Sequence, residues 1–167
     1  AQLINKTNQF NLTSRRLSES EVRSLIGRPD CYTQALRLRD RFGDSGLCGA
    51  LIAFTEGDRL RISDWLLSCR VLGRELERAM LAALMRYARE QGLRHVLGEY
   101  VPTGRNGQVG DLFDRLGFER SEEGPAGKRT YRWDLGQGSF QGAIHCQVDD
   151  RTQVCRGDFR SLHCGNG

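Results

Sequence analysis

The fold of this chain is decided between residues 68 and 92, where the sequence reads SCRVLGRELERAMLAALMRYAREQG. The second half of this stretch has apolar residues at helical spacing, at Leu76, Met80, Leu84 and Tyr87. This spacing predicts an amphipathic helix with one buried face, and Gly92 predicts where the helix ends. The first half is a short turn that follows an apolar run, so the stretch predicts a strand–turn–helix unit.

The turn before this helix has a glycine between two arginines. Gly73 stands between Arg70 and Arg74, directly after a predicted strand that ends near Cys69. The first turn of a helix presents unpaired backbone N–H groups and the positive end of the helix dipole, and a glycine lets an anion approach them closely. The turn is therefore a candidate cradle for a pyrophosphate group, with a simple glycine cap as the alternative interpretation.

The residues on either side of this unit predict an α/β domain. Extended patterns occur at 31–40, 47–54, 60–69, 94–102 and 128–135, and helical patterns occur up to about residue 10, after residue 18 and within 106–118. Ser18 stands three residues before Glu21, which is a capping-box pattern. This order predicts a central mixed sheet flanked by helices. We expect one domain at residues 1–135 and a C-terminal tail or extension of unknown structure at 136–167.

The composition is that of a globular protein, with 38% hydrophobic and 28% charged residues among 167. No apolar run approaches the roughly 20 residues that cross a bilayer, and the start lacks the order of a secretory signal, so we expect a cytoplasmic protein without membrane contact. The net charge is +4, and apart from Lys6 and Lys128 every basic residue is arginine. Codon bias explains this excess, and affinity for phosphate ligands is the alternative. Basic and aromatic residues do not interleave, so no nucleic-acid partner is expected.

The six cysteines form two groups. Cys31, Cys48 and Cys69 lie in or near predicted strands, and we expect them to be buried thiols. The tail has three more with two neighbouring histidines: Cys146, Cys155, Cys164, His145 and His163. This is enough ligand chemistry for zinc or a disulfide, but the C-x-x-C spacing of zinc knuckles is missing, so no metal is expected.

Two motifs at the right separation resemble the GNAT acyltransferase superfamily. Its acyl-CoA pyrophosphate loop reads [QR]-x-x-G-x-[GA], which Arg70 and Gly73 match at the first two fixed positions. Its next strand–helix unit often reads N-x-x-A-x-x-x-[YF]-x-x-x-G-F, and this chain has matching spacings at Asn106, Val109, Phe113, Gly117 and Phe118. The resemblance covers roughly residues 47 to 120 and implies a GNAT-like fold that binds acetyl-CoA or another acyl-CoA.

A narrower resemblance covers about residues 2 to 118. The segments QLINKTNQFNLTSRR, DRFGDSGLCG, LSCRVLGRELE and EYVPTGRN look like the C-terminal region of FkbH-like proteins (HAD subfamily IIIC) of polyketide biosynthesis. In that family a phosphatase-like HAD domain loads a glyceryl unit onto an acyl carrier protein. The HAD signature D-x-D-x-[TV] is absent here, so the resemblance implies the GNAT-like half, with an acyl carrier protein as partner and a HAD-type domain in cis or in trans.

The chain departs from the GNAT pattern at two positions. Glu75 stands where the loop has its second glycine or alanine, and its carboxylate competes for the place of a pyrophosphate. We therefore expect Glu75→Gly to strengthen CoA binding. Phe113 stands where many GNAT enzymes carry a tyrosine that protonates the leaving thiolate, so the proton donor is missing. The phosphopantetheine arm of a carrier protein is thus an alternative cofactor to CoA.

The resemblance, carried over residue by residue, implies the site. Glu99 is the candidate general base and Tyr100 a candidate hydroxyl donor, with a solvated carboxylate and a packed aromatic ring as alternatives. Candidate cofactor-binding residues are Leu67, Ser68, Arg70, Val71, Leu72, Gly73, Arg74, Glu75, Asn106 and Phe113. Asn106 is expected to bond a pantetheine amide or, alternatively, to cap the following helix. Asp64 and His95 are expected at the surface.

Two functions follow from these expectations. The first is a GNAT-type acyltransferase of polyketide or other natural-product biosynthesis, in which strand groups near Leu67 and Ser68 hold an acyl thioester and Glu99 takes the acceptor's proton. The second is a catalytically inactive GNAT-like module that docks an acyl carrier protein for a partner HAD-type glyceryl-transfer domain. Glu75 and Phe113 favour the second function, whereas Arg70, Gly73 and Asn106 favour the first.

Overall fold

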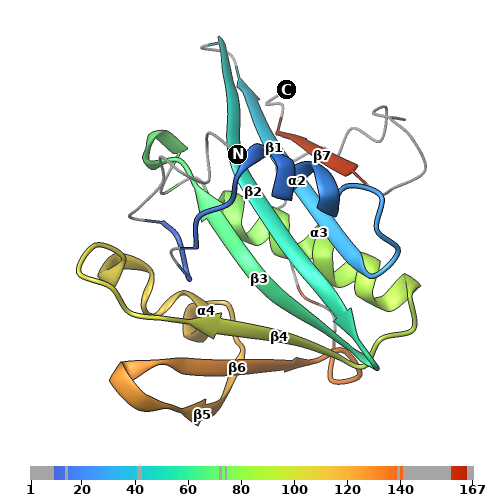
Figure 1. Ribbon diagram of the computed structural model, residues 1–167, viewed down its shortest axis with the longest axis vertical. Coiled ribbons are helices and arrows are strands. Elements are labelled where there is room, and N and C mark those ends of the chain that lie inside the picture. The colour runs from blue at the N-terminus through green and yellow to red at the C-terminus, as the bar shows by residue number, and fades with distance from the viewer. Residues whose placement is uncertain are drawn as a thin grey trace.

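The computed structural model describes residues 10–13, 15–40, 43–71, 73, 75–138, 140 and 159–164, with backbone alone at 39, 40, 43–45, 70 and 159–164. These residues form a seven-stranded mixed sheet in the order β5-β6-β4-β3-β2-β1-β7 (Figure 1). The strands are β1 (Cys31–Asp40), β2 (Gly43–Glu56), β3 (Arg59–Leu67), β4 (His95–Tyr100), β5 (Glu119–Glu123), β6 (Arg129–Asp134) and β7 (Phe159–Cys164).

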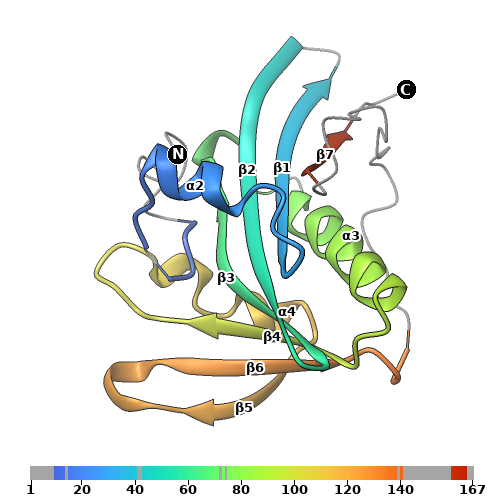
Figure 2. The ribbon, with the colours of Figure 1, turned by 45° about the vertical axis from the view of Figure 1, so that its right-hand side comes forward.

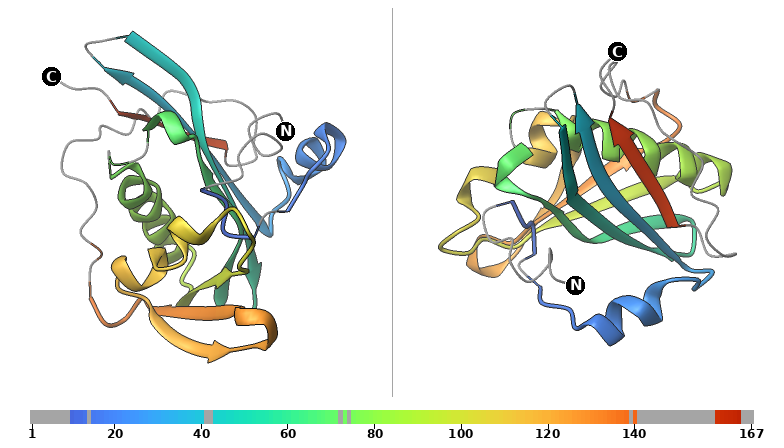
Figure 3. Two further views of the ribbon diagram at one scale, coloured as in Figure 1. Left: turned by 90° about the vertical axis from the view of Figure 1, so that its left-hand side faces the viewer. Right: turned by 90° about the horizontal axis from the view of Figure 1, so that it is seen from above.

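Helices cover both faces of the sheet. The α-helices are α2 (Glu19–Leu25), α3 (Leu76–Glu90) and α4 (Leu112–Arg115), and the short 3₁₀ turns are η1 (Cys69–Val71), η2 (Gly107–Val109) and η3 (Pro125–Gly127). α3 packs on one face of the sheet and α2 lies on the other (Figures 2 and 3). The expected fold class, a mixed α/β sheet flanked by helices, is confirmed.

The predicted helix after the turn is the main packing element of the larger core. Leu76, Met80, Leu84 and Tyr87 are all buried, and they pack in a cluster with residues of β1, β2, β3 and β4. The predicted capping box also forms, because the Ser18 side chain accepts from the Glu21 N–H and the Glu21 carboxylate accepts from the Ser18 N–H. A smaller cluster of Leu17, Cys31, Ile52 and Leu66 lies on the α2 side of the sheet.

The strands β3 and β4 pair in parallel over three positions and then separate. Their register joins Arg59 to His95, Leu60 to Val96 and Arg61 to Leu97, and no ladder pair follows. Figure 1 shows the two strands diverging from this end of the sheet. The other neighbours pair in longer ladders, which are antiparallel between β1 and β2, β2 and β3, β4 and β6, and β5 and β6.

Two strands were not predicted from the sequence. The segment ERSEE of β5 has no apolar residue, all five of its residues are exposed, and it is held by antiparallel pairing with β6. In the tail, β7 pairs in parallel with β1. The domain boundary after residue 135 stays a prediction. The helix expected before residue 10 lies outside the described residues, as do Cys146, Cys155 and His145.

The expectation for the first three cysteines is wrong in one case. Cys31 and Cys48 are buried, but Cys69 is exposed because it opens the 3₁₀ turn after β3. Burial raises the pKa of the Cys31 thiol to about 11. Within the described ranges no group of three His, Cys, Asp or Glu residues could hold a metal ion. In the same ranges no helix combines the length and the apolar character that a membrane span requires.

Candidate functional site

The gap between the ends of β3 and β4 begins at a bulge in β3. The register between β2 and β3 shifts between Ile52 and Ala53, which makes Ser63 an extra residue on β3. Beyond the bulge, the Ser68 N–H donates to the Cys48 carbonyl across the β2 side at 2.7 Å. Since backbone groups alternate along a strand, the Trp65 carbonyl and the Leu67 N–H point toward β4 instead. The sequence predicted that strand groups near Leu67 and Ser68 hold a thioester arm; the Leu67 N–H faces β4, whereas the Ser68 N–H is bonded to β2.

The chain's own residues 10–13, called here the bridging segment, occupy this edge of β3. The Leu67 N–H donates to the Phe10 carbonyl at 3.2 Å, and the Leu12 N–H donates to the Trp65 carbonyl at 3.4 Å. Asn11 and Leu66 form the antiparallel bridge between these two bonds. The segment, dark blue in Figure 1, lies between the diverging strands. Its backbone therefore takes the place of a neighbouring strand.

The bridging segment also bonds to the end of β4. The Val101 N–H donates to the Leu12 carbonyl at 3.0 Å, and the Asn106 Nδ2 donates to the Asn11 carbonyl at 2.9 Å. Phe10, Asn11 and Leu12 are all buried, with at most 4% of each residue exposed. The thioester arm that the sequence predicted at Leu67 and Ser68 thus meets a backbone edge that is already hydrogen-bonded to the chain itself.

Asn106 holds the bridging segment to the loop after β4. It is fully buried, its Oδ1 accepts from the Thr103 N–H at 2.7 Å, and its Nδ2 donates to the Val101 carbonyl at 3.0 Å as well as to Asn11. The alternative that Asn106 caps the following helix is wrong, because its side chain makes no cap hydrogen bond to η2. All of its described bonds go to the chain's own backbone and to Tyr100.

Aromatic rings fill the helix side of the gap. Phe113, on α4, lies directly over Gly98, where a built Cβ would come within 2.3 Å of the ring. Its ring also contacts Trp65 at 6.1 Å between centroids and Tyr131 at 5.0 Å. The Phe113 side chain is therefore part of the core. The Tyr131 hydroxyl donates to Asp114 at 3.1 Å, and burial together with this bond raises the pKa of Tyr131.

The two predicted catalytic residues face opposite sides of the sheet. Tyr100 is 3% exposed, its hydroxyl lies 3.3 Å from the Asn106 Oδ1, and the Arg129 guanidinium stacks 4.7 Å from its ring centroid. Glu99 lies on the other face, where its carboxylate pairs with the Lys128 Nζ at 2.8 Å. Since successive residues of a strand alternate between faces, these two groups do not act on one atom.

In its described part, the turn between β3 and α3 is held by a hydrogen bond within the turn. The Val71 N–H donates to the Ser68 carbonyl at 3.1 Å, and Val71 is buried in the core. Gly73 and Glu75 both have positive φ, of 79° and 54°. Glu75 starts α3 without a side-chain cap bond. Leu72, Arg74 and the Arg70 side chain lie outside the described residues.

Asp64 is a buried carboxylate that the sequence placed at the surface, and this expectation is wrong. It is 2% exposed, the Ser63 hydroxyl donates to its Oδ2 at 2.6 Å, and the nearest Arg15 nitrogen is 4.0 Å away. Within the described part of the chain, its Oδ1 has no hydrogen-bond partner. The bulge at Ser63 changes which face of β3 Asp64 takes, and no sequence pattern indicates that bulge. His95 is partly buried rather than exposed.

Comparison with known proteins supports the fold. Neither the family models nor the curated proteins contain a match to the sequence. The GNAT domain of S. lividans PAT aligns at 18% identity over 71% of this chain and 70% of that chain, with a TM-score of 0.55. The ribosomal-protein-S18-alanine N-acetyltransferase from Escherichia coli aligns at 14% identity over 78% and 83%, with a TM-score of 0.53. The chain therefore has the GNAT fold.

The alignments with other solved structures are shorter. A GNAT-family chain from Desulfovibrio desulfuricans is 17% identical, with a TM-score of 0.48, over 55% of this chain and 64% of that chain. The chain thus spans less than two thirds of the length of that relative.

Proposed function

We propose that this domain is a non-catalytic GNAT-fold module that docks an acyl carrier protein. Its setting is a cytoplasmic polyketide or natural-product pathway, with a HAD-type glyceryl-transfer domain in cis or in trans. The observation that carries the proposal is the bridging segment, whose Phe10 and Leu12 backbone groups occupy the edge of β3. A GNAT fold whose β3 edge is already paired retains a rigid sheet and a docking surface. The Trp65 and Leu67 backbone groups at that edge are not free to align an acyl thioester.

The energetics favour a permanent bridge over a movable one. Withdrawing residues 10–13 would return two buried apolar side chains, Phe10 and Leu12, to water, at a cost of about 1.5–3 kcal/mol each. It would also leave the Asn106 amide without its Asn11 partner in a buried site. A thioester arm would have to supply equivalent contacts merely to compensate for this loss.

The surroundings of the gap also favour a non-catalytic role. Phe113 has no hydroxyl and its ring rests on Gly98, so no proton donor stands at that position. Glu99 is held by Lys128 on the opposite face from Tyr100. The candidate base and the candidate acid therefore have no shared position for a reacting atom.

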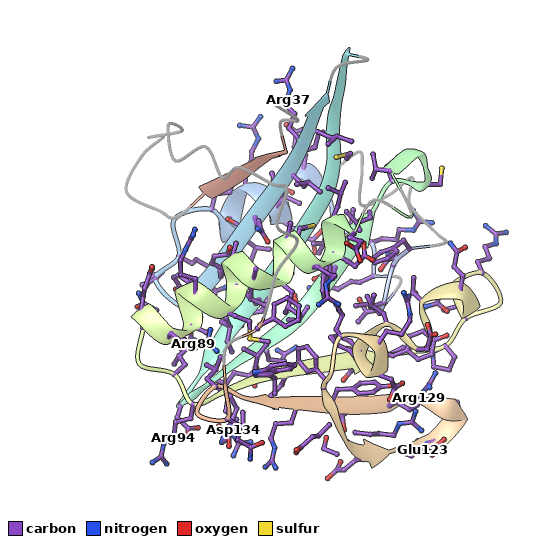
Figure 4. All side chains as sticks on the ribbon, turned by 180° about the vertical axis from the view of Figure 1, so that it is seen from behind. Arg37, Arg89, Arg94, Glu123, Arg129 and Asp134 are labelled. Atoms are coloured by element: carbon purple, nitrogen blue, oxygen red, sulfur yellow. The ribbon has the colours of Figure 1, made fainter. Side chains whose placement is uncertain are left out.

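Basic side chains surround the ends of β3 and β4 and suit an acidic partner. Five of them lie in the segments that meet there: Arg15, Arg16, Arg105, Lys128 and Arg129. Figure 4 labels Arg129 at the start of β6, beside the end of β4. The acidic groups near these segments are Glu75, Glu99, the buried Asp64 and Glu123, which is the register partner of Arg129 on β5. Carrier proteins are acidic as a class, and such complementarity speeds association and fixes orientation.

Calorimetric titration with two ligands tests the proposal. We expect a holo acyl carrier protein to bind with micromolar affinity and acetyl-CoA to show no measurable binding. Replacing Arg105 and Arg129 with glutamate should weaken carrier binding at least tenfold, whereas Arg86→Glu on α3 is the control and should leave it unchanged. Micromolar binding of acetyl-CoA, without carrier binding, would overturn the docking role.

An acyltransferase is the second candidate function, and one observation favours it. The divergence of β3 and β4 after the Ser63 bulge leaves strand ends apart, and a mobile bridging segment would uncover the Trp65 and Leu67 groups. In that case acetyl-CoA should speed hydrogen exchange at the Leu12 amide, because the arm would displace it. Under the docking proposal, exchange at Leu12 is the same with and without acetyl-CoA.

A further inference from the structure

The face of the sheet opposite α3 has a cavity, called here the trough, over strands β3, β4, β5 and β6. The cavity has a volume of about 360 Å³ and is lined by side chains of β3, β4, β5 and β6. This volume falls within the range of pockets that hold small molecules. The bridging segment does not line it, so the trough is a different place from the gap between the strand ends.

Two arginines stand on either side of the trough's centre. Arg61 on β3 is the register partner of Leu97 on β4, and Leu97 is in turn the partner of Arg132 on β6. The two arginine backbones are thus two strand spacings apart, roughly 10 Å, with the shorter Leu97 side chain between them. Both side chains line the cavity, but the Arg61 guanidinium now lies 6.0 Å from the Phe54 ring centroid on β2, and that of Arg132 lies toward Glu119 on β5. Convergence over Leu97 therefore requires each exposed side chain to change its rotamer. Two planar forks facing each other suit a phosphate group.

The present partners of these arginines leave donors for a ligand. The Arg61 Nε bonds the Glu56 carboxylate at 2.7 Å, which uses one of its five N–H groups. The nearest carboxylate to Arg132 is Glu119 at 3.6 Å, beyond hydrogen-bond length. Both arginines are about half exposed, at 41% and 50%. Exposed pairs of this kind contribute about 0–1 kcal/mol, so a phosphate can replace them.

Three further groups define the rest of the trough. His95 lies at one end beside Arg59, and its buried Nδ1 has no hydrogen-bond partner within the described residues. Glu99 lies at the other end, neutralised by Lys128 at 2.8 Å. Glu122 lines the β5 side and is exposed, where its charge is solvated. The basic side chains of the trough are Arg59, Arg61, His95 and Arg132. Arg59 lies 3.5 Å from the Asp58 carboxylate, so each of the three arginines has one exposed carboxylate as its present partner.

We propose that this trough is a binding site for a phosphate ester, clamped between Arg61 and Arg132 over Leu97. The phosphate belongs either to the arm of a docked carrier protein or to a free phosphorylated small molecule. Only the first source rests on the proposed docking function. The site lies on the face of the sheet opposite α3, whereas the predicted pyrophosphate cradle is the turn at the start of α3.

Titrations followed by amide NMR test the site with inorganic phosphate and with 4′-phosphopantetheine. We expect shifts centred on His95, Leu97 and Arg132. The double change Arg61→Gln with Arg132→Gln should weaken phosphate binding at least tenfold, because each removes a charged donor pair. Arg86→Gln is the matched control, since Arg86 is 47% exposed and pairs with Glu90 on the α3 face; it should change binding less than twofold. Unchanged binding in the double variant, or shifts centred on the start of α3, would overturn the site.

Carrier proteins with and without the arm distinguish the two sources. Shifts at Leu97 with the holo form alone would assign the phosphate to the arm. Shifts with the free phosphates but with neither carrier form would assign a small molecule, leaving the trough as a phosphate site while the docking proposal fails. Carrier binding without any shift at Leu97 or His95 under all probes would overturn the trough and leave docking standing.

Discussion

Strands β3 and β4 are connected in two different ways along their length. At their first ends the backbones pair directly, from Arg59 with His95 to Arg61 with Leu97. At their far ends the connection runs through the bridging segment, with Phe10 and Leu12 bonded to β3 and Leu12 bonded to Val101 after β4. At both ends, hydrogen bonds thus join the two strands, either directly or through the bridging segment, and buried backbone groups need such partners.

The difference shows that a divergence of strands is not by itself a ligand site. Polar backbone groups at a buried edge need partners, and either a ligand or a distant piece of the chain can provide them. Here the chain provides them, and side chains complete the closure, with Phe113 on one side and Asn106 at the end. The separated ends of β3 and β4 are therefore packed as part of the core.

The largest expected effect is at the point where the strands separate. Gly98 is the first residue of β4 after the last direct pair, and Phe113 lies over it. In Gly98→Ala the new methyl group would overlap the ring, because the built Cβ lies 2.3 Å from its nearest atom. Overpacking of this kind should lower the free energy of unfolding by about 3 kcal/mol or more, as measured by urea denaturation.

Gly104→Ala is the matched control for that change. A Cβ at Gly104 meets no heavy atom within 4 Å, and the residue does not have positive φ. We expect its effect to stay within about 0.5 kcal/mol. Equal effects at the two glycines would mean that Phe113 is free to move and that the helix side of the gap is not closed.

The second largest effect is expected when the hydrogen bonds of the Asn106 side chain, after the end of β4, are changed. Asn106→Asp keeps the shape of the side chain but replaces the Nδ2 donor, so an oxygen would face the carbonyls of Asn11 and Val101. Buried acceptors without a donor should cost about 2–3 kcal/mol. Hydrogen exchange should quicken at the Leu12 and Leu67 amides before global unfolding.

Gln108→Glu makes the same amide-to-acid change at an exposed position two residues away. It should leave both stability and exchange at Leu12 unchanged. Fast exchange at Leu12 in the unaltered protein would contradict a permanent bridge, whatever the outcome at Asn106.

The sequence predicted the elements that have a clear period and missed those that depend on distant partners. The spacing of Leu76, Met80 and Leu84 predicted α3, and the apolar runs predicted β2 and β3. The pairing of the bridging segment was not predicted, because its partners are more than 50 residues away along the chain. No local pattern states where an extended segment will pair.

The candidate site was predicted with less success because it relied on a family pattern rather than on geometry. Strand alternation alone places Glu99 and Tyr100 on opposite faces, which argues against a shared catalytic role. The burial of Asp64 was not predicted, and a bulge at Ser63 changes which face of β3 this residue takes. The basic trough was also missed, because its arginines come from strands that are far apart in sequence.

A smaller effect is expected at the residue that starts α3. Glu75 has φ 54°, a conformation that costs a residue with a Cβ roughly 1–2 kcal/mol. After the greater flexibility of glycine in the unfolded chain is counted, Glu75→Gly should raise the free energy of unfolding by about 1 kcal/mol. The same change at Glu77, inside the first turn of α3, should lower it by about 1 kcal/mol. If the bridging segment closes the site, Glu75→Gly gains no CoA binding, contrary to the sequence-based expectation.

The smallest expected effect tests whether the bridging segment acts through its backbone alone or also needs a specific side chain. The Thr13 hydroxyl donates to the Ser63 carbonyl at 3.0 Å, which makes it the bridging segment's contact with the bulge. Thr13→Val removes this donor at nearly constant volume and should cost about 0.5–1 kcal/mol by urea denaturation. Thr103→Val, at an exposed threonine of the loop after β4, should cost less than that. A loss of 2 kcal/mol or more at Thr13 would mean that the bulge depends on this hydroxyl. The bridging segment would then shape β3, and not only pair with an edge that β3 forms alone.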